Sequence, residues 1–512
     1  MDRRTRVLIV AIVVSFIAFL DGAVINVALP SLAAELGGGL ALQQWAVDAY
    51  LLTLGSLILL AGSLSDSFGR LRIIRIGLYG FAVTSVICAI APTGLVFVIG
   101  RALQGAAGAL LVPSSLALII ATFPRSEQGH AIGRWTAWTT SAFLIGPLFG
   151  GLLVDLFSWR LAFWINVVPI AVVLVLMRAL GRDEPNPGRE RIDWTGAALG
   201  IIGLGGTVFA LIEQGRFGWG SPVVWVPFTV GLAALVAFVL WERRAPHPML
   251  PLTLFRARNF AWGNLATLFI YASFSLGPFA MTIFLQQAAG FSATLAGLAT
   301  LPPTIMLVLL GSWFGGLSTR FGPRIFMTLG PLIVAVGYLL TLAVQDPLVY
   351  WVQFLPGILV VGLGMAMTVA PLTAAILGAV DPARAGIGSA VNNAVARIAG
   401  LVAIASIGVI VGTQLDVDGY HRAAIATAAF LAIGGVVSWL GIRNPVPMPD
   451  ATGATPRPAH SPSTGSTHVP PHTAELTGGG PPVTRPRVRR PSCRPPRGPR
   501  SRRPRPRRRG RP

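Results

Sequence analysis

The chain has no lysine, few charged side chains of any kind and only two cysteines. Charged residues make up 12% of its 512 positions, whereas soluble globular domains carry about 25%. The absence of lysine, with heavy use of Ala, Gly and Pro, is typical of a GC-rich genome and indicates no particular function. Cys88 and Cys493 are too few for a disulfide framework or a cysteine metal site. The sequence has no phosphate-binding loop, metal-ligand cluster or nucleophile elbow, so we expect no metal, no other cofactor, no ATP hydrolysis and no catalytic residues.

Long uncharged runs indicate that most of the chain lies in lipid. Residues 259–319 and 347–380 contain no charged side chain, and the mean hydropathy is +0.69. Because a membrane helix needs about 20 apolar residues, the first run holds two spans, with a turn near Gly290. A signal peptide is the alternative for residues 1–20, but no small-residue cleavage site follows them. We predict an all-α integral membrane protein with 14 transmembrane helices, at residues 7–29, 44–64, 73–92, 95–121, 132–153, 161–180, 194–212, 222–241, 260–285, 294–317, 324–344, 349–378, 385–411 and 422–441.

The arginines predict how these helices are oriented. With the N-terminus in the cytoplasm, about 20 arginines before the tail fall on the cytoplasmic side, including Arg182, Arg189 and Arg191, and three fall outside, namely Arg160, Arg216 and Arg422. We therefore predict a multi-pass protein of the cell membrane with both termini cytoplasmic.

The C-terminal residues 444–512 differ in composition from the rest of the chain. They are rich in Pro, Arg, Ser, Thr and Gly, and they carry much of the net charge of +21. Such a segment cannot bury a core, so we predict a disordered cytoplasmic tail. Its arginines could contact anionic lipid headgroups, but a solvated appendage is favoured. Because the charge is concentrated there, we expect membrane lipids as partners and no nucleic acid.

An internal repeat divides the helices into two sets. Residues 315–322 echo residues 62–69, and both follow the second span of a six-helix set. We predict an N-terminal six-helix half at 1–180, two additional helices with linkers at 181–258, and a C-terminal six-helix half at 259–443. In the second copy Thr319 stands in the place of Asp66.

The first copy of this repeat carries the most specific pattern in the chain. Gly62, Leu64, Asp66, Gly69, Arg70 and Arg72 match G-x-L-x-D-x-x-G-R-x-R, which resembles the loop between the second and third helices of the major facilitator superfamily of transporters. The six-two-six arrangement is similar to the 14-helix drug:proton antiporter branch of that superfamily. The resemblance implies a cytoplasmic gate formed by Gly62, Asp66, Gly69, Arg70 and Arg72. A solvated turn obeying the positive-inside rule would explain Arg70 and Arg72, but not Asp66 and Gly69.

Asp21 interrupts the apolar first span. An ionised carboxylate at membrane depth costs about 3 kcal/mol on insertion scales, so it is retained where it pairs, meets water or binds a proton. The surrounding residues resemble the first-helix signature L-D-x-T-V-x-N-V-A-L-P of the 14-helix branch, with Ala23 in place of the threonine. The resemblance implies proton coupling at Asp21. The alternative is a hydrated acid near the outer membrane surface.

Arg101 lies early in the fourth span, and Gln104 follows one turn later on the same helix face. Because an arginine side chain does not lose its proton, it requires an acceptor. The segment resembles the family motif R-x-x-Q-G-x-x-x-A, which implies a role for Arg101 in proton transfer with a neighbouring acid. The alternative is an arginine that extends to the outer interface.

Residues 146–151 read G-P-L-F-G-G in the fifth span. Pro147 removes a backbone donor, and Gly146 and Gly150 permit close helix packing. With Gly151, these residues resemble the antiporter signature G-P-x-x-G-G of exporting branches, which favours export over uptake.

Further polar and aromatic side chains are candidates for a substrate cavity. The thirteenth span has no acid and carries a positive Arg397, which argues against a preference for dicationic substrates. The expected cavity residues are Asn26, Asp48, Gln104, Trp138, Phe143, Asn392, Asn393 and Arg397.

Taken with the resemblance, these residues predict a proton-coupled exporter of small amphipathic compounds such as drugs or antibiotics. Its two halves would give alternating access, and its partners would be a small-molecule substrate and protons. A dedicated exporter of one metabolite or lipid shares every feature, whereas an uptake symporter is disfavoured by Pro147 and its glycines. A membrane-embedded enzyme or receptor is disfavoured, because the sequence has no clustered set of catalytic residues. The oligomeric state is not set by the sequence, and a monomer is the simplest expectation.

Overall fold

The computed structural model describes residues 2–181, 193–381, 384–412 and 414–444. Within these ranges it is all-helical, and 14 helical segments are long and apolar enough to cross a membrane, which confirms the expected fold class and number of spans. The tail beyond Asn444, Cys493 within it, and Arg182, Arg189 and Arg191 lie outside the described residues.

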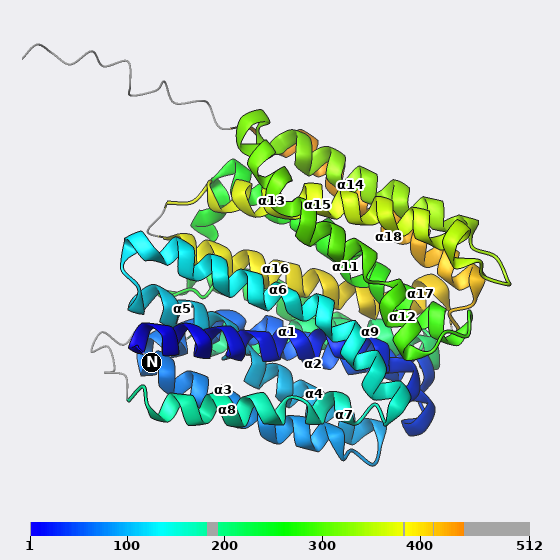
Figure 1. Cartoon of the computed structure of the whole chain (residues 1–512), viewed down its shortest axis with the longest axis horizontal. Helices are drawn as coiled ribbons and strands as arrows, with labels where there is room; N and C mark the ends of the chain where they lie inside the picture. Colours follow the sequence, from blue (N-terminus) through cyan, green and yellow to red (C-terminus); the bar gives the residue numbers. More distant parts are fainter. Residues whose placement is uncertain (1, 182–192, 382–383, 413, 445–512) are drawn as a thin grey trace, which may run out of the picture. The chain divides into compact units, whose positions relative to one another are not determined.

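The N-terminal group contains the first six spans (Figure 1). Its elements are α1 (Arg3–Leu36), α2 (Gly39–Phe68), α3 (Arg70–Ala89), α4 (Gly94–Ala109) with α5 (Val112–Thr122), α6 (Arg125–Leu156), and α7 (Leu161–Trp164) with α8 (Val167–Arg178).

Two additional spans, α9 (Trp194–Phe217) and α10 (Pro222–Arg244), follow in the chain, and the C-terminal group supplies the last six. That group consists of η1 (Leu252–Arg256), α11 (Arg258–Gln287), α12 (Ala293–Ala299) with α13 (Pro302–Phe321), α14 (Pro323–Leu340) with η2 (Thr341–Ala343), η3 (Tyr350–Phe354) with α15 (Leu355–Leu377), α16 (Ala385–Ala405) with α17 (Ile407–Val411), and α18 (Val417–Gly441).

Consecutive spans run in alternating directions, so the bundle has two ends. One end, named the basic end for Arg3, Arg4, Arg70 and Arg72, holds the start of α1 and the junction between α2 and α3. The opposite end, named the far end, holds the end of α1 at Leu36. Arg160, Arg216 and Arg422 lie at the far end, next to the ends of spans.

Residues 62–68 are not a loop, contrary to the expectation from sequence. They form the last two turns of α2, and α3 begins after the single residue Gly69. Gly69 has φ 93° and ψ 134°, a conformation open to glycine and strained for other residues. The second copy of the repeat is built in the same way, because Gly322, with φ 82° and ψ 152°, separates α13 from α14. The helix continues until a glycine permits the turn.

Several spans also differ from their expected ends. α1 continues through Pro30 to Leu36. The proline removes one helical hydrogen bond, but Leu29 and Leu32 beside it are buried against other parts of the protein, so the helix does not end there. The sixth span is interrupted between α7 and α8, where Asn166 lies. The turn after α11 contains Gly290, with φ 70°, as expected.

The largest hydrophobic cluster joins the two groups. It contains buried residues of α1 and α2 together with residues of α11, α12 and α16. α1 packs against α6 and α2, and α11 packs against α16 and α18. The two additional helices α9 and α10 attach to the rest of the bundle through α9. Val208 and Ile212 of α9 form a hydrophobic cluster with Leu401 of α16, and Leu52 of α2 packs at the edge of this cluster.

The two glycines of the first repeat copy differ in conformation, which gives a matched pair of variants. Gly69→Ala should lower the stability by about 1–3 kcal/mol, since alanine is strained at φ 93°. Gly62→Ala should leave it unchanged or raise it by about 0.5–1 kcal/mol, since Gly62 is inside a helix and a Cβ there meets no atom within 4 Å. Thermal unfolding of the purified protein in detergent measures both, and equal effects would contradict the assigned break at Gly69.

Candidate functional site

A buried ion pair between α1 and α4 is the most unusual polar feature of the described bundle. The Arg101 Nη1 atom lies 2.7 Å from Asp21 Oδ2, and both side chains are 1% exposed. The Arg101 Nε atom donates to the carbonyl oxygen of Ala46 in α2 at 2.8 Å, and Nη1 also donates to Gln104 Oε1 at 2.6 Å. The arginine is therefore fixed by three acceptors from three helices.

The second carboxylate oxygen of Asp21 is also saturated with donors. Asp21 Oδ1 accepts from Gln104 Nε2 at 3.0 Å and from Asn166 Nδ2 at 2.8 Å. Gln104 Nε2 in turn donates to Ser85 Oγ in α3 at 2.9 Å. Both oxygens of the Asp21 carboxylate thus accept hydrogen bonds, from side chains of α4 and of the residue just before α8.

Small residues let the surrounding helices come close enough to form this cluster. A Cβ atom on Gly105 would collide with the backbone carbonyl of Tyr50, and one on Gly100 would lie 2.8 Å from Cys88 Sγ. The Tyr50 ring centroid is 4.5 Å from the guanidinium carbon of Arg101, a cation–π contact. The arginine is thus tightly packed against its neighbours.

The structure excludes both alternatives considered for these residues. Asp21 lies at the middle of α1 and is 2% exposed, so it is not a hydrated acid near a membrane surface. Arg101 is 0% exposed and does not extend to an interface. The two residues singled out separately in the sequence are in direct contact.

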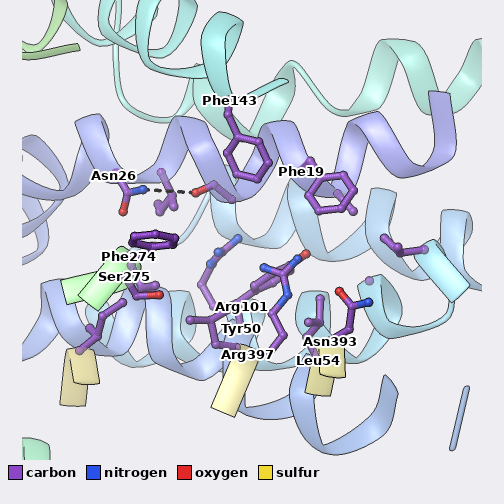
Figure 2. A pocket seen from close by; sticks show the side chains of 18 of the residues that line it. Phe19, Asn26, Tyr50, Leu54, Arg101, Phe143, Phe274, Ser275, Asn393 and Arg397 are labelled. Carbon is purple, nitrogen blue, oxygen red and sulfur yellow. Dashed lines mark hydrogen bonds between the residues drawn. The ribbon is translucent and has the colours of Figure 1, made fainter. Parts of the chain in front are cut away.

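A cavity of about 180 Å³ adjoins the ion pair. Its wall is formed by α1, α2, α4, α5 and α6 on one side and by α11 and α16 on the other. Figure 2 shows Arg101, Tyr50 and Arg397 directed into the same space. Four of the expected cavity residues lie on this wall, namely Asn26, Phe143, Asn393 and Arg397.

The other four expected cavity residues do not line this cavity. Gln104 belongs to the ion-pair cluster, and Trp138 is 60% exposed. Asn392 is turned toward α11, where its Nδ2 donates to Asn264 Oδ1 at 3.2 Å and to Thr267 Oγ1 at 3.0 Å. Asp48 is fully buried in α2, and neither of its carboxylate oxygens has a hydrogen-bond partner among the described residues.

The residues 146–151 lie where α6 contacts both groups. Cβ atoms on Gly146 and Gly150 would lie 2.5 Å from Ala23 Cβ and 2.9 Å from Val24 Cγ1 of α1. Gly151 faces α12 instead, where a Cβ would lie 2.6 Å from Thr294 Cα. Pro147 also contacts α12, because its carbonyl group packs against Gly297. The motif residues therefore let α6 pack closely between α1 and the C-terminal group.

The far end carries further contacts between the two groups. Asp155, near the end of α6, accepts hydrogen bonds from the backbone nitrogens of Ala293 at 3.0 Å and Thr294 at 2.8 Å. Gln286 Nε2 of α11 donates to the carbonyl of Val27 in α1 at 3.2 Å. At this end the two groups are held together.

The expected gate residues form a looser arrangement at the basic end. Arg70 Nη2 lies 3.4 Å from Asp66 Oδ1, and the Asp66 side chain is 62% exposed. Arg72 is exposed, and Gly62 and Gly69 have the backbone roles given above. Asp66 thus pairs with an arginine of its own group.

Three residues of this site were not among those expected from the sequence. Asn166 and Ser85 complete the hydrogen bonding around Asp21, and Tyr50 covers Arg101. The available signal was a polar side chain within an apolar span, as for Asn166 between Ile165 and Val167. Among the described residues, no group of three or more His, Cys, Asp or Glu side chains is placed to hold a metal ion.

Comparison with known proteins identifies the family of the chain. The family model of the Major Facilitator Superfamily matches residues 11–404, and again residues 263–493. The chain belongs to this superfamily. It is therefore a multi-pass member of a family of transporters.

Individual relatives of this superfamily member cover nearly its whole length. It is 34% identical over 437 residues to the methylenomycin A resistance protein of Bacillus subtilis (strain 168), covering 84% of this chain and 92% of that protein. It is 33% identical over 478 residues to a puromycin resistance protein of Streptomyces alboniger, with coverage of 88% and 94%. The crystal structure of a peptide transporter has the same fold, with a TM-score of 0.65 at 15% identity, covering 86% of this chain and 98% of that chain.

The ion pair predicts that removing either partner lowers the stability of the protein. Asp21→Ala leaves a buried cation that cannot lose its proton, and removing one partner of a buried pair costs about 3–5 kcal/mol. Arg101→Ala leaves the Asp21 carboxylate buried without its cation, and its cost should be similar.

Thermal unfolding in detergent measures these losses. Both buried variants should unfold at a clearly lower temperature than wild type, and Arg72→Ala, at an exposed position, should change little. Wild-type stability in both buried variants would contradict a buried ion pair.

Proposed function

We propose that this protein is a proton-coupled exporter of small amphipathic compounds, including antibiotics. It lies in the cell membrane with both termini in the cytoplasm, so the basic end is cytoplasmic, in keeping with the positive-inside rule. The observation that carries the proposal is the buried Asp21–Arg101 pair, since an acid at the centre of the membrane is a natural proton carrier. The names of the relatives, which concern antibiotic resistance, favour export.

Proton binding and the ion pair exclude one another in this scheme. In the described arrangement both oxygens of Asp21 accept hydrogen bonds, and Arg101 occupies Oδ2. A proton can be accepted on Asp21 Oδ2 after Arg101 has moved away, and Arg101 must then find another acceptor. Each proton taken up and released therefore accompanies a shift of α1 relative to α4.

Alternating access follows from the contacts between the two groups. The contacts of Asp155 and Gln286 hold the far, outer end closed. Opening outward requires these contacts to break, and Asp66 with Arg70 and Arg72 would then form a closing gate at the cytoplasmic end. Gly146, Pro147, Gly150 and Gly151 place α6 at this moving interface. The protein would act as a monomer, since each chain contains both groups and the cavity.

A single dedicated substrate is the main competing proposal. A panel of acidic, neutral and basic antibiotics and dyes, measured as accumulation in cells that express the protein, separates a broad exporter from a dedicated one. A protonophore should raise accumulation of every exported compound. Flux in inverted vesicles tests the direction and would identify an uptake symporter.

The proton-carrying role of Asp21 predicts a specific transport defect. Asp21→Asn keeps the size of the side chain but cannot bind or release a proton, so efflux driven by a pH gradient in proteoliposomes should be lost. Exchange of labelled for unlabelled substrate at equal pH should continue. Glu127→Gln, at an acid that pairs with Arg4 on the surface, should retain both activities. Undiminished gradient-driven efflux in Asp21→Asn would exclude this assignment.

The closed outer end predicts a change in accessibility. Ala296 of α12 is fully buried, so a cysteine in Ala296→Cys should react slowly with a membrane-impermeant maleimide on intact cells. Adding Asp155→Ala removes the two contacts to α12 and should speed the reaction several-fold. The matched control is Glu35→Ala, because Glu35 lies at the same end but bonds to Trp159 and Arg160 within its own group. Equal rates in both backgrounds would contradict a closure by Asp155.

A further inference from the structure

The charges around the cavity are all positive. Among the described residues that line it, the charged ones are Arg101 and Arg397, and none is acidic. Arg101 is neutralised by Asp21. Arg397 makes no ion pair with any described residue, so the wall of the cavity carries one positive charge without a partner.

Arg397 lies in the middle of its membrane span, so its charge can be neutralised only from the cavity. It is the twelfth residue of the 26-residue span Gly386–Val411. At 1.5 Å per residue, about 16 Å or more of helix separates it from either end. An arginine side chain is too short to reach water at an end from there, and a charge at this depth requires a partner or a water-filled space.

The protein contacts of Arg397 fix its position but do not neutralise it. Its guanidinium carbon is 5.7 Å from the ring centroid of Phe19 in α1, and its Cβ lies 3.5 Å from the place of a Cβ on Gly55 in α2. Both contacts are with the N-terminal group, whereas Arg397 belongs to the C-terminal group. The guanidinium donors remain available to a ligand between the groups.

We propose that this cavity binds small organic anions, with an acidic group of the ligand held by the guanidinium of Arg397. Arginine binds carboxylate-like groups with two parallel hydrogen bonds, which suits this role. An apolar or aromatic part of the ligand lies against Phe19, Phe143 and Phe274. The inference rests on the proposed function and adds the class of compound that is exported.

The size of the cavity sets what fits in the described arrangement. About 180 Å³ accommodates the acidic group and little more, since pockets for drug-sized ligands measure about 300–1,000 Å³. The rest of the ligand enters when the two groups separate. Because Arg397 belongs to the C-terminal group and Phe19 to the N-terminal group, a ligand held by both contacts the two groups at once.

Two dyes with one ring skeleton and opposite charge test the proposal. Fluorescein is an anion and rhodamine 123 is a cation, and their binding to the full-length protein in detergent is measured by fluorescence anisotropy. Wild type should bind fluorescein at least about tenfold more tightly than rhodamine 123, and Arg397→Met should remove most of this preference. Arg397→Lys, which keeps the charge without the planar fork, should fall between them.

A control separates charge from packing. Arg216 also stacks on an aromatic ring, with its guanidinium carbon 4.9 Å from the Phe217 centroid, but it lies at the far end outside the cavity. Arg216→Met should leave both affinities unchanged. Thermal unfolding in detergent should show that Arg397→Met remains folded, which makes lost binding a property of the site.

The outcomes distinguish this inference from the proposed function. Equal affinity for both dyes, no binding of either, or undiminished fluorescein binding in Arg397→Met overturns the anion site. If neutral or basic compounds are still exported under a pH gradient, the proposed function stands without it. If fluorescein binds through Arg397 but no compound, fluorescein included, is moved by a pH gradient in proteoliposomes, the anion site stands and proton-coupled export is excluded.

Discussion

Water is absent from the hydrocarbon core of a membrane, so each polar group there must find its partner inside the protein. Asp21 and Arg101 show how much structure this requirement organises. Their contact engages α1, α2, α3 and α4 and the junction before α8, through the carbonyl of Ala46 and the side chains of Ser85 and Asn166. Five parts of the N-terminal group are therefore ordered around one carboxylate. Moving any of them changes the environment of that carboxylate.

Close packing supplies the second constraint on the bundle. Helices in lipid have no hydrophobic driving force between them, and they associate where small residues let their backbones meet. α6 contacts α1 through Gly146 and Gly150 and contacts α12 through Gly151. Such a contact is favourable only at short range, so it is either made or lost. This makes the interface suited to two discrete arrangements rather than a continuous deformation.

The sequence predicted the elements whose causes are local. Fourteen spans follow from hydropathy and length, and Asp21 and Arg101 stand out because a charge in an apolar span is costly. The sequence prediction placed the turn near Gly69 over too many residues, because the polar residues 65–67 suggest a loop. One residue with positive φ is sufficient to separate the two helices. Helix periodicity could not show that Asn392 faces α11 while Asn393 faces the cavity. Nor could it place Asn166 beside Asp21, since that contact joins positions 145 residues apart.

The attachment of α9 has a consequence for the route that cargo takes. α9 lies across the line where α2 and α16 meet, and its Leu204, Val208 and Ile212 pack against residues of both helices. Gly55 of α2 and Arg397 of α16 adjoin at this seam. Acyl chains are thereby kept away from the polar interior along it. Under the proposed function, a compound in the cavity would have no path into the bilayer through this seam.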